Sequence, residues 1–79
     1  MQLFATVYFE EGGTTSCLNF NNQDVYDILT KGLIPFMTDW NVPADGLCWA
    51  SIMNEEGKEL LVIQVRPTPT SRVGYAYGV

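Results

Sequence analysis

The stretch LFATVYFEEGGTTSCLNF, residues 3–20, decides the fold of this chain. Residues alternate strictly at its start, with Leu3, Ala5, Val7 and Phe9 on one face and Phe4, Thr6 and Tyr8 on the other. A period of two is typical of a β-strand. Gly12-Gly13 permits the positive φ angles of a tight turn, and residues 14–20 return as a second strand. The stretch therefore predicts a β-hairpin.

The hairpin is followed by a helical pattern. Asn21-Asn22 can cap a helix, and Asp24 falls in its first turn, where a carboxylate complements the helix dipole. Apolar residues then recur at helical spacing: Val25, Ile28, Leu29, Leu33, Phe36, Met37 and Trp40. Gly32 and Pro35 interrupt this stripe. Either the helix kinks there, or it ends at Lys31 and a short second helix begins near Pro35, which is the interpretation we favour.

Two more strands complete the predicted order ββ-α-ββ. Turn residues 41–46 lead into a strand at 47–53, and a tight connection at 54–58 leads into a strand at 59–66. Residues 60–63 are apolar without alternation, so we expect the last strand to be central and covered on both faces. The fold class is α+β: a small antiparallel sheet of four to five strands with one helix, or a kinked helix pair, packed on one face.

The last thirteen residues form a separate pattern. Residues 67–70 alternate Pro and Thr, which predicts an extended linker, and residues 73–79 alternate large residues with Gly or Ala as a strand does. This tail could be a fifth strand of the same sheet, could add to a neighbour's sheet, or could lie in a partner's groove. We therefore expect a single domain over residues 1–79, with a core at 1–66 and a linker and tail strand at 67–79.

Composition points to apolar residues on the surface. Hydrophobic residues make up 47% of the 79-residue chain and charged residues only 16%, below the usual quarter. So few charges cannot cover a domain this small, and we expect an apolar patch that a partner covers. Trp40 should lie in the core by its helical register, whereas Trp49 could be a core residue or an interface anchor.

Charge narrows the class of partner. The net charge of −5 disfavours direct binding to nucleic acid and suits a basic protein partner, or simply solubility. Met1-Gln2-Leu3 runs into patterned sequence with no signal peptide, and no apolar run has the length of a membrane span. Cys17 and Cys48 could form a disulfide, but we expect two buried free thiols in a reducing cytoplasm.

Catalytic and metal-binding patterns are scarce in the sequence. It contains no histidine, the two cysteines lack metal-site spacing, and Gly12-Gly13 lacks the lysine of a phosphate loop. Asp24 and Asp27 share a helix face and suit its N-terminus. We therefore expect a non-enzymatic protein with no cofactor and no bound metal.

These features favour a small acidic protein that binds and inhibits or modulates a larger, basic or nucleic-acid-binding, protein. Acidic hairpin tips would steer association and aromatic residues of the tail would hold the complex. The predicted protein-binding residues are Glu10, Glu11, Glu55, Glu56, Arg72, Tyr75 and Tyr77. By class analogy only, the chain resembles the accessory inhibitors of phages and mobile elements. The alternative is an assembly subunit that forms a homodimer or larger homo-oligomer through its outer sheet face and tail.

Overall fold

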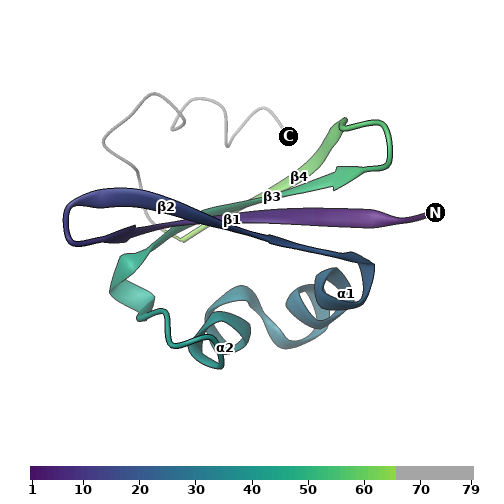
Figure 1. The fold of residues 1–79 in the computed structure, drawn as a ribbon. Coiled ribbons are helices and arrows are strands. Elements are labelled where there is room, and N and C mark those ends of the chain that lie inside the picture. The colour runs from purple at the N-terminus through teal and green to yellow at the C-terminus, as the bar shows by residue number, and fades with distance from the viewer. Residues whose placement is uncertain (66–79) are drawn as a thin grey trace.

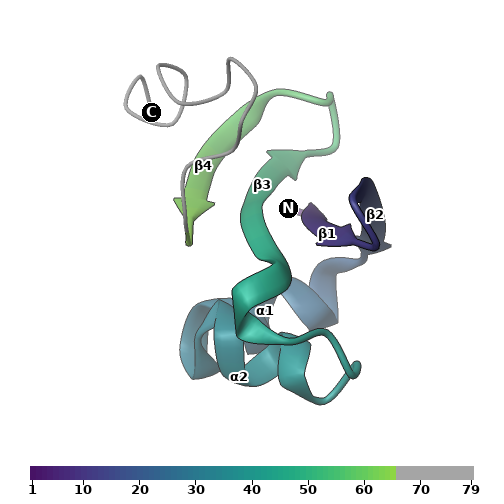
Figure 2. The ribbon, with the colours of Figure 1, turned by 90° about the vertical axis from the view of Figure 1, so that its left-hand side faces the viewer.

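The structure, a computed structural model, describes residues 1–65 (Figure 1). Its elements are β1 (Leu3–Glu11), β2 (Thr14–Phe20), α1 (Asn22–Lys31), α2 (Leu33–Thr38), the 3₁₀ helix η1 (Ala44–Gly46), β3 (Leu47–Asn54) and β4 (Glu59–Gln64). The four strands form one antiparallel sheet in the order β2-β1-β3-β4. Both helices lie on the same face of that sheet (Figures 1 and 2). The predicted α+β class is confirmed, while the proposed tail strand at 73–79 lies outside the described residues.

The β1–β2 hairpin forms as its glycines predict. Glu11 is paired with Thr14, which leaves a two-residue loop. Gly12 and Gly13 have φ angles of 59° and 81°. Two consecutive positive φ angles are those of a type I′ turn, whose twist matches that of the flanking strands. The turn sets the register that places Ala5, Val7 and Phe9 on the buried face of β1.

The helical segment is two helices, as the sequence favoured. Gly32 separates them with a φ of 101°, and its N–H donates to the Ile28 carbonyl at 2.9 Å, closing α1. Pro35 lies in the first turn of α2, where a missing N–H costs no intrahelical hydrogen bond. Asn21 occupies the N-cap position of α1, although its side chain makes no cap hydrogen bond. The Asn22 side chain instead accepts a hydrogen bond from the Leu3 N–H, which ties α1 to β1.

The core lies between the helix pair and the sheet. Buried side chains come from every strand except β4, from both helices and from the loop after α2: Ala5, Val7, Phe9, Phe20, Val25, Ile28, Leu33, Phe36, Met37, Val42, Leu47, Ala50 and Ile52. Ile63 and Val65 only pack against its margin. The helices therefore pack mainly over β1 and β3, and β4 lies at the margin of the core.

The expectation that residues 60–63 form a central strand is wrong. β3 occupies the centre, because it pairs with both β1 and β4, and its first six residues are buried. Among residues 1–65, β4 lies at the edge of the sheet, and Leu60 and Leu61 are exposed at 40% and 39%. The apolar sequence of β4 is therefore not explained by burial on both faces.

Candidate functional site

The predicted acidic tips lie at opposite ends of the sheet. Glu11 is paired with Thr14 at one end, whereas Leu3 is paired with Asn54, just before Glu55 and Glu56, at the other. With β1 nine residues long, a rise of roughly 3.3 Å per residue puts about 26 Å between the two ends. The structure therefore does not gather the four glutamates into one patch. Arg72, Tyr75 and Tyr77 lie outside the described residues.

The helix-free face of the sheet carries an aromatic pair. Tyr8 stacks on Trp49 with ring centroids 4.2 Å apart and an interplanar angle of 16°. Phe4 and Met53 are register partners further along the same face. Trp49 is only 8% exposed, so the structure places it as a packed residue rather than as a free interface anchor.

Trp40 is the exposed tryptophan, contrary to its predicted place in the core. Its side chain is 50% exposed. The prediction extended the helical register through residue 40, but α2 ends at Thr38 and the chain then turns. The Trp40 ring is nevertheless fixed, because it packs edge-on against buried Phe20, with centroids 5.2 Å apart, and lies 6.4 Å from the ring of Phe36. One side of the indole is thus held by the core and the other is free to bind.

The backbone around Trp40 is held by hydrogen bonds. The Trp40 and Val42 N–H groups both donate to the Met37 carbonyl, at 2.9 and 3.2 Å, and the Asn41 N–H donates to the Thr38 carbonyl at 3.0 Å. Asn41 has a φ of 62°, a left-handed conformation that asparagine tolerates better than most residues. These bonds hold the backbone from which the indole projects.

A shallow hollow of about 340 Å³ adjoins this turn. It is lined by Thr38, Asn41, Val42, Pro43 and Ala44. Asp39 and Asp45 are acidic and exposed on either side of this segment. We call Trp40, this hollow and the two aspartates the Trp40 surface. A half-exposed tryptophan on a fixed backbone beside a hollow has the geometry of a binding hot spot.

The charge of the described residues is strongly negative. Residues 1–65 contain all nine acids of the chain but only two of its four cations, Lys31 and Lys58, which gives a formal net charge of −7. One of those cations is engaged, since Lys31 Nζ lies 3.3 Å from Asp39 Oδ2 in an exposed ion pair. The field of this part of the molecule attracts a positively charged surface.

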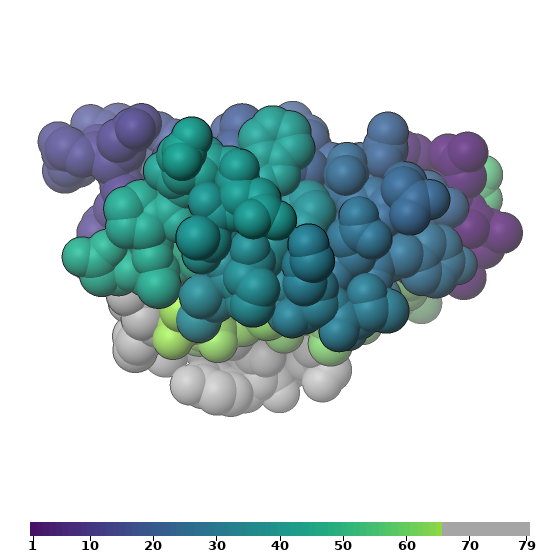
Figure 3. Space-filling model, turned by 90° about the horizontal axis from the view of Figure 1, so that it is seen from below, coloured from purple at the N-terminus to yellow at the C-terminus, as the bar shows by residue number. Residues whose placement is uncertain are grey.

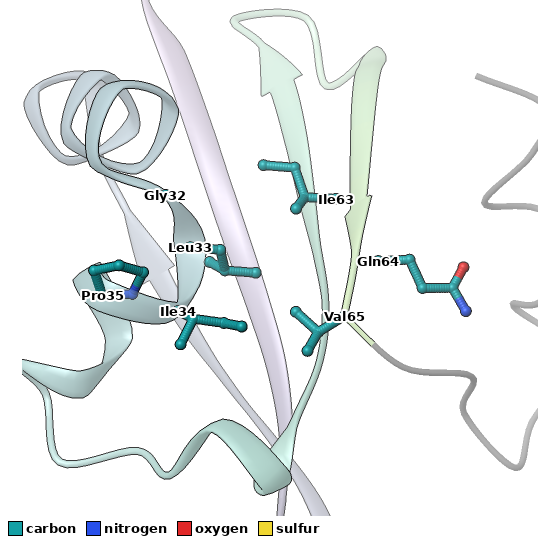
Figure 4. A pocket seen from close by; sticks show the side chains of 7 residues that line it. All are labelled: Gly32, Leu33, Ile34, Pro35, Ile63, Gln64 and Val65. Atoms are coloured by element: carbon teal, nitrogen blue, oxygen red, sulfur yellow. The ribbon is translucent and has the colours of Figure 1, made fainter.

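A second apolar surface lies where the helices meet β4. A groove of about 370 Å³ is lined by Gly32, Leu33, Ile34, Pro35, Ile63, Gln64 and Val65. Ile63 and Val65 point toward Leu33 and Ile34, while Gln64 points away to the other face (Figure 4). Ile34 is 42% exposed, and β4 remains visible beyond the margin of the helices (Figure 3). We call this surface the β4 groove.

Residues 1–65 contain no group of three Cys, Asp or Glu side chains placed to hold a metal ion. Both cysteines are free thiols; Cys48 is buried as expected, but the expectation of a buried Cys17 is wrong. Cys17 is exposed because it lies on the helix-free face of β2, a polar edge strand, opposite Tyr8.

Comparison of the chain with protein-family models, with curated proteins and with solved structures found no match. Across residues 1–65, no helix is both long enough and apolar enough to cross a lipid bilayer. The case for function thus depends on the two surfaces. Sequence reasoning missed both, although the Asn41-Val42-Pro43 turn after Trp40 was a signal that the helical register ends before it.

Proposed function

We propose that this chain is a non-enzymatic binding protein that inhibits or modulates a larger protein with a basic surface. The observation that carries the proposal is Trp40: a half-exposed indole, braced by Phe20, in an acidic part of the chain. Tryptophan is among the residues that contribute most to protein–protein binding, and a ring already fixed loses little side-chain entropy on binding.

Charge supports a basic partner. The formal charge of −7 on residues 1–65 would accelerate the encounter with a positive surface and repel a nucleic acid. Inhibition would follow by occupancy, because a basic surface covered by this chain cannot engage its own anionic ligand. We place this activity in the cytoplasm, since a reducing compartment suits the free Cys17 and Cys48 thiols.

The experiment is affinity capture with the full chain as bait, followed by binding kinetics on the purified partner. We expect Trp40→Ala to weaken binding by roughly thirtyfold, the loss typical of a hot-spot residue. Added salt should slow association more than it speeds dissociation. Tyr26→Ala is the matched control, because Tyr26 is an equally exposed aromatic, at 51%, on α1. A partner that binds Trp40→Ala as tightly as the unmodified chain, with no effect of salt, would exclude this function.

A further inference from the structure

Trp40 offers an aromatic face to a partner. Its ring and that of Phe20 lie at 74° with centroids 5.2 Å apart, an edge-to-face arrangement in which Phe20 can cover only one face of the indole. The Trp40 side chain is half exposed, and the exposed Asp39 directly precedes it. The face of an aromatic ring carries partial negative charge and a carboxylate carries a full one, so this place attracts a cation rather than an anion.

Further acids lie at the end of the sheet to which the chain runs after Trp40. Asp45 is exposed in η1, and the neighbouring Gly46 lies so close to β1 that a Cβ there would be 3.0 Å from the Glu10 carbonyl oxygen. Asp45 therefore lies close to the tip of the β1–β2 hairpin, where Glu11 is also exposed. The hollow of the Trp40 surface thus belongs to a segment that has an acid at each end.

The basic side chains of residues 1–65 leave this region acidic. There are two of them, Lys31 and Lys58. Lys58 lies at the opposite end of the sheet, because its carbonyl accepts a hydrogen bond from the N–H of Asn54, the register partner of Leu3. Lys31 Nζ lies 3.3 Å from Asp39 Oδ2, but both side chains are exposed, and exposed ion pairs contribute little to stability. A cation of the partner can therefore replace Lys31 at Asp39 at little cost.

We propose that the Trp40 surface receives an arginine side chain of the basic partner, with the guanidinium stacked on the open face of the indole and paired with Asp39. Arginine suits this place better than lysine, because its planar, weakly hydrated guanidinium stacks on an aromatic ring and still donates to a carboxylate in its own plane. The apolar part of the side chain can lie along the hollow at Pro43 and Ala44. This inference rests on the proposed function, since it names the group by which the partner is recognised.

The test is a titration of the full, ¹⁵N-labelled chain with a blocked glycine–arginine–glycine peptide, followed by NMR. The chain contains two tryptophans, so the indole N–H signal of buried Trp49 is an internal control for that of Trp40. We expect a saturable shift of the Trp40 signal and none of the Trp49 signal. A peptide with citrulline in place of arginine, which keeps the shape without the charge, should bind at least about fivefold more weakly, and a lysine peptide should fall between the two.

Asp39→Asn should weaken binding of the arginine peptide by about two- to fivefold, because it removes the carboxylate beside the ring. Glu56→Gln is the matched control, since it also removes one exposed acid but at the opposite end of the sheet, and it should bind as the unmodified chain does. A citrulline peptide that binds as tightly as the arginine peptide would overturn the proposal. Shifts centred on the amides of Glu55 and Glu56 instead of Trp40 would also overturn it, because they would show only a general attraction to acids.

The titration uses the unmodified chain, so its result does not depend on whether a variant folds. It also separates this inference from the proposed function. If the arginine peptide does not shift the Trp40 signal but a captured partner still loses affinity for Trp40→Ala, the arginine is wrong and the proposed function stands. If a captured partner binds Trp40→Ala as tightly as the unmodified chain, the proposed function is wrong, and recognition of that partner through arginine falls with it.

Discussion

β3 and β4 are adjacent strands with similar apolar content and opposite surroundings. Ile52 on β3 is directly paired with Leu61 on β4, and both side chains point toward the helix layer. Ile52 is 2% exposed, whereas Leu61 is exposed to more than a third of its surface. The difference arises from position in the sheet, since β3 has a strand on each side and β4 borders β3 alone within residues 1–65. An apolar sequence therefore does not by itself place a strand at the centre of a sheet.

The largest expected effect is a difference in the cost of truncating Ile52 and Leu61, measured as the free energy of unfolding. Ile52→Ala should lower the free energy of unfolding by about 2–5 kcal/mol, because it leaves a cavity in the closed core. Leu61→Ala should cost about 1 kcal/mol, because its side chain is already partly in water. Urea denaturation at a concentration where the chain is monomeric measures both values. Equal costs would mean that β4 is covered in the monomer.

A smaller effect is expected at the turn that joins the two strands. Gly57 has a φ of 80°, and a Cβ there would meet no atom within 4 Å. The cost of Gly57→Ala is therefore conformational alone, about 1–2 kcal/mol. Gly57→Asn should cost less, since asparagine enters the left-handed region more readily. Urea denaturation of both variants gives the order, and a neutral Gly57→Ala would show that the turn does not fix the β3–β4 register.

The sequence predicted most of the fold because its decisive signals are local. Alternation over residues 3–9 and the Gly12-Gly13 turn specify the hairpin, and Gly32 marks the end of α1. The order of strands in the sheet is not local. Residues 60–63 were predicted to be a buried central strand because they are all apolar. An apolar run does not encode the position of its strand in the sheet.

The candidate site was predicted less well for a related reason. The exposure of Trp40 depends on α2 ending at Thr38, and a difference of two residues in a helix end moves a side chain from core to surface. The acidic pairs were predicted at hairpin tips, but their separation by the length of β1 follows from strand pairing that no short stretch of sequence encodes.

A side-chain hydrogen bond also links the two strands. Buried Ser51 on β3 donates its hydroxyl to the carboxylate of Glu59 on β4. Ser51→Ala should lower the free energy of unfolding by about 1 kcal/mol, the usual net value for one such bond. A double-mutant cycle with Glu59→Gln isolates the coupling between the pair. A coupling energy of zero would mean that the bond adds nothing to the attachment of β4.

The smallest expected effect extends the contrast to the opposite edge of the sheet. Cys17 is exposed on β2 and Cys48 is buried on β3, so iodoacetamide should modify Cys17 in the folded chain and reach Cys48 only when the sheet opens. Cys17→Ser should change the free energy of unfolding by less than about 0.5 kcal/mol, as expected for an exposed site. Mass spectrometry of the labelled chain, with and without urea, measures the two rates. Rapid labelling of Cys48 without urea would show that β3 is accessible to solvent in the folded chain. The difference in burial between β3 and β4 would then be contradicted.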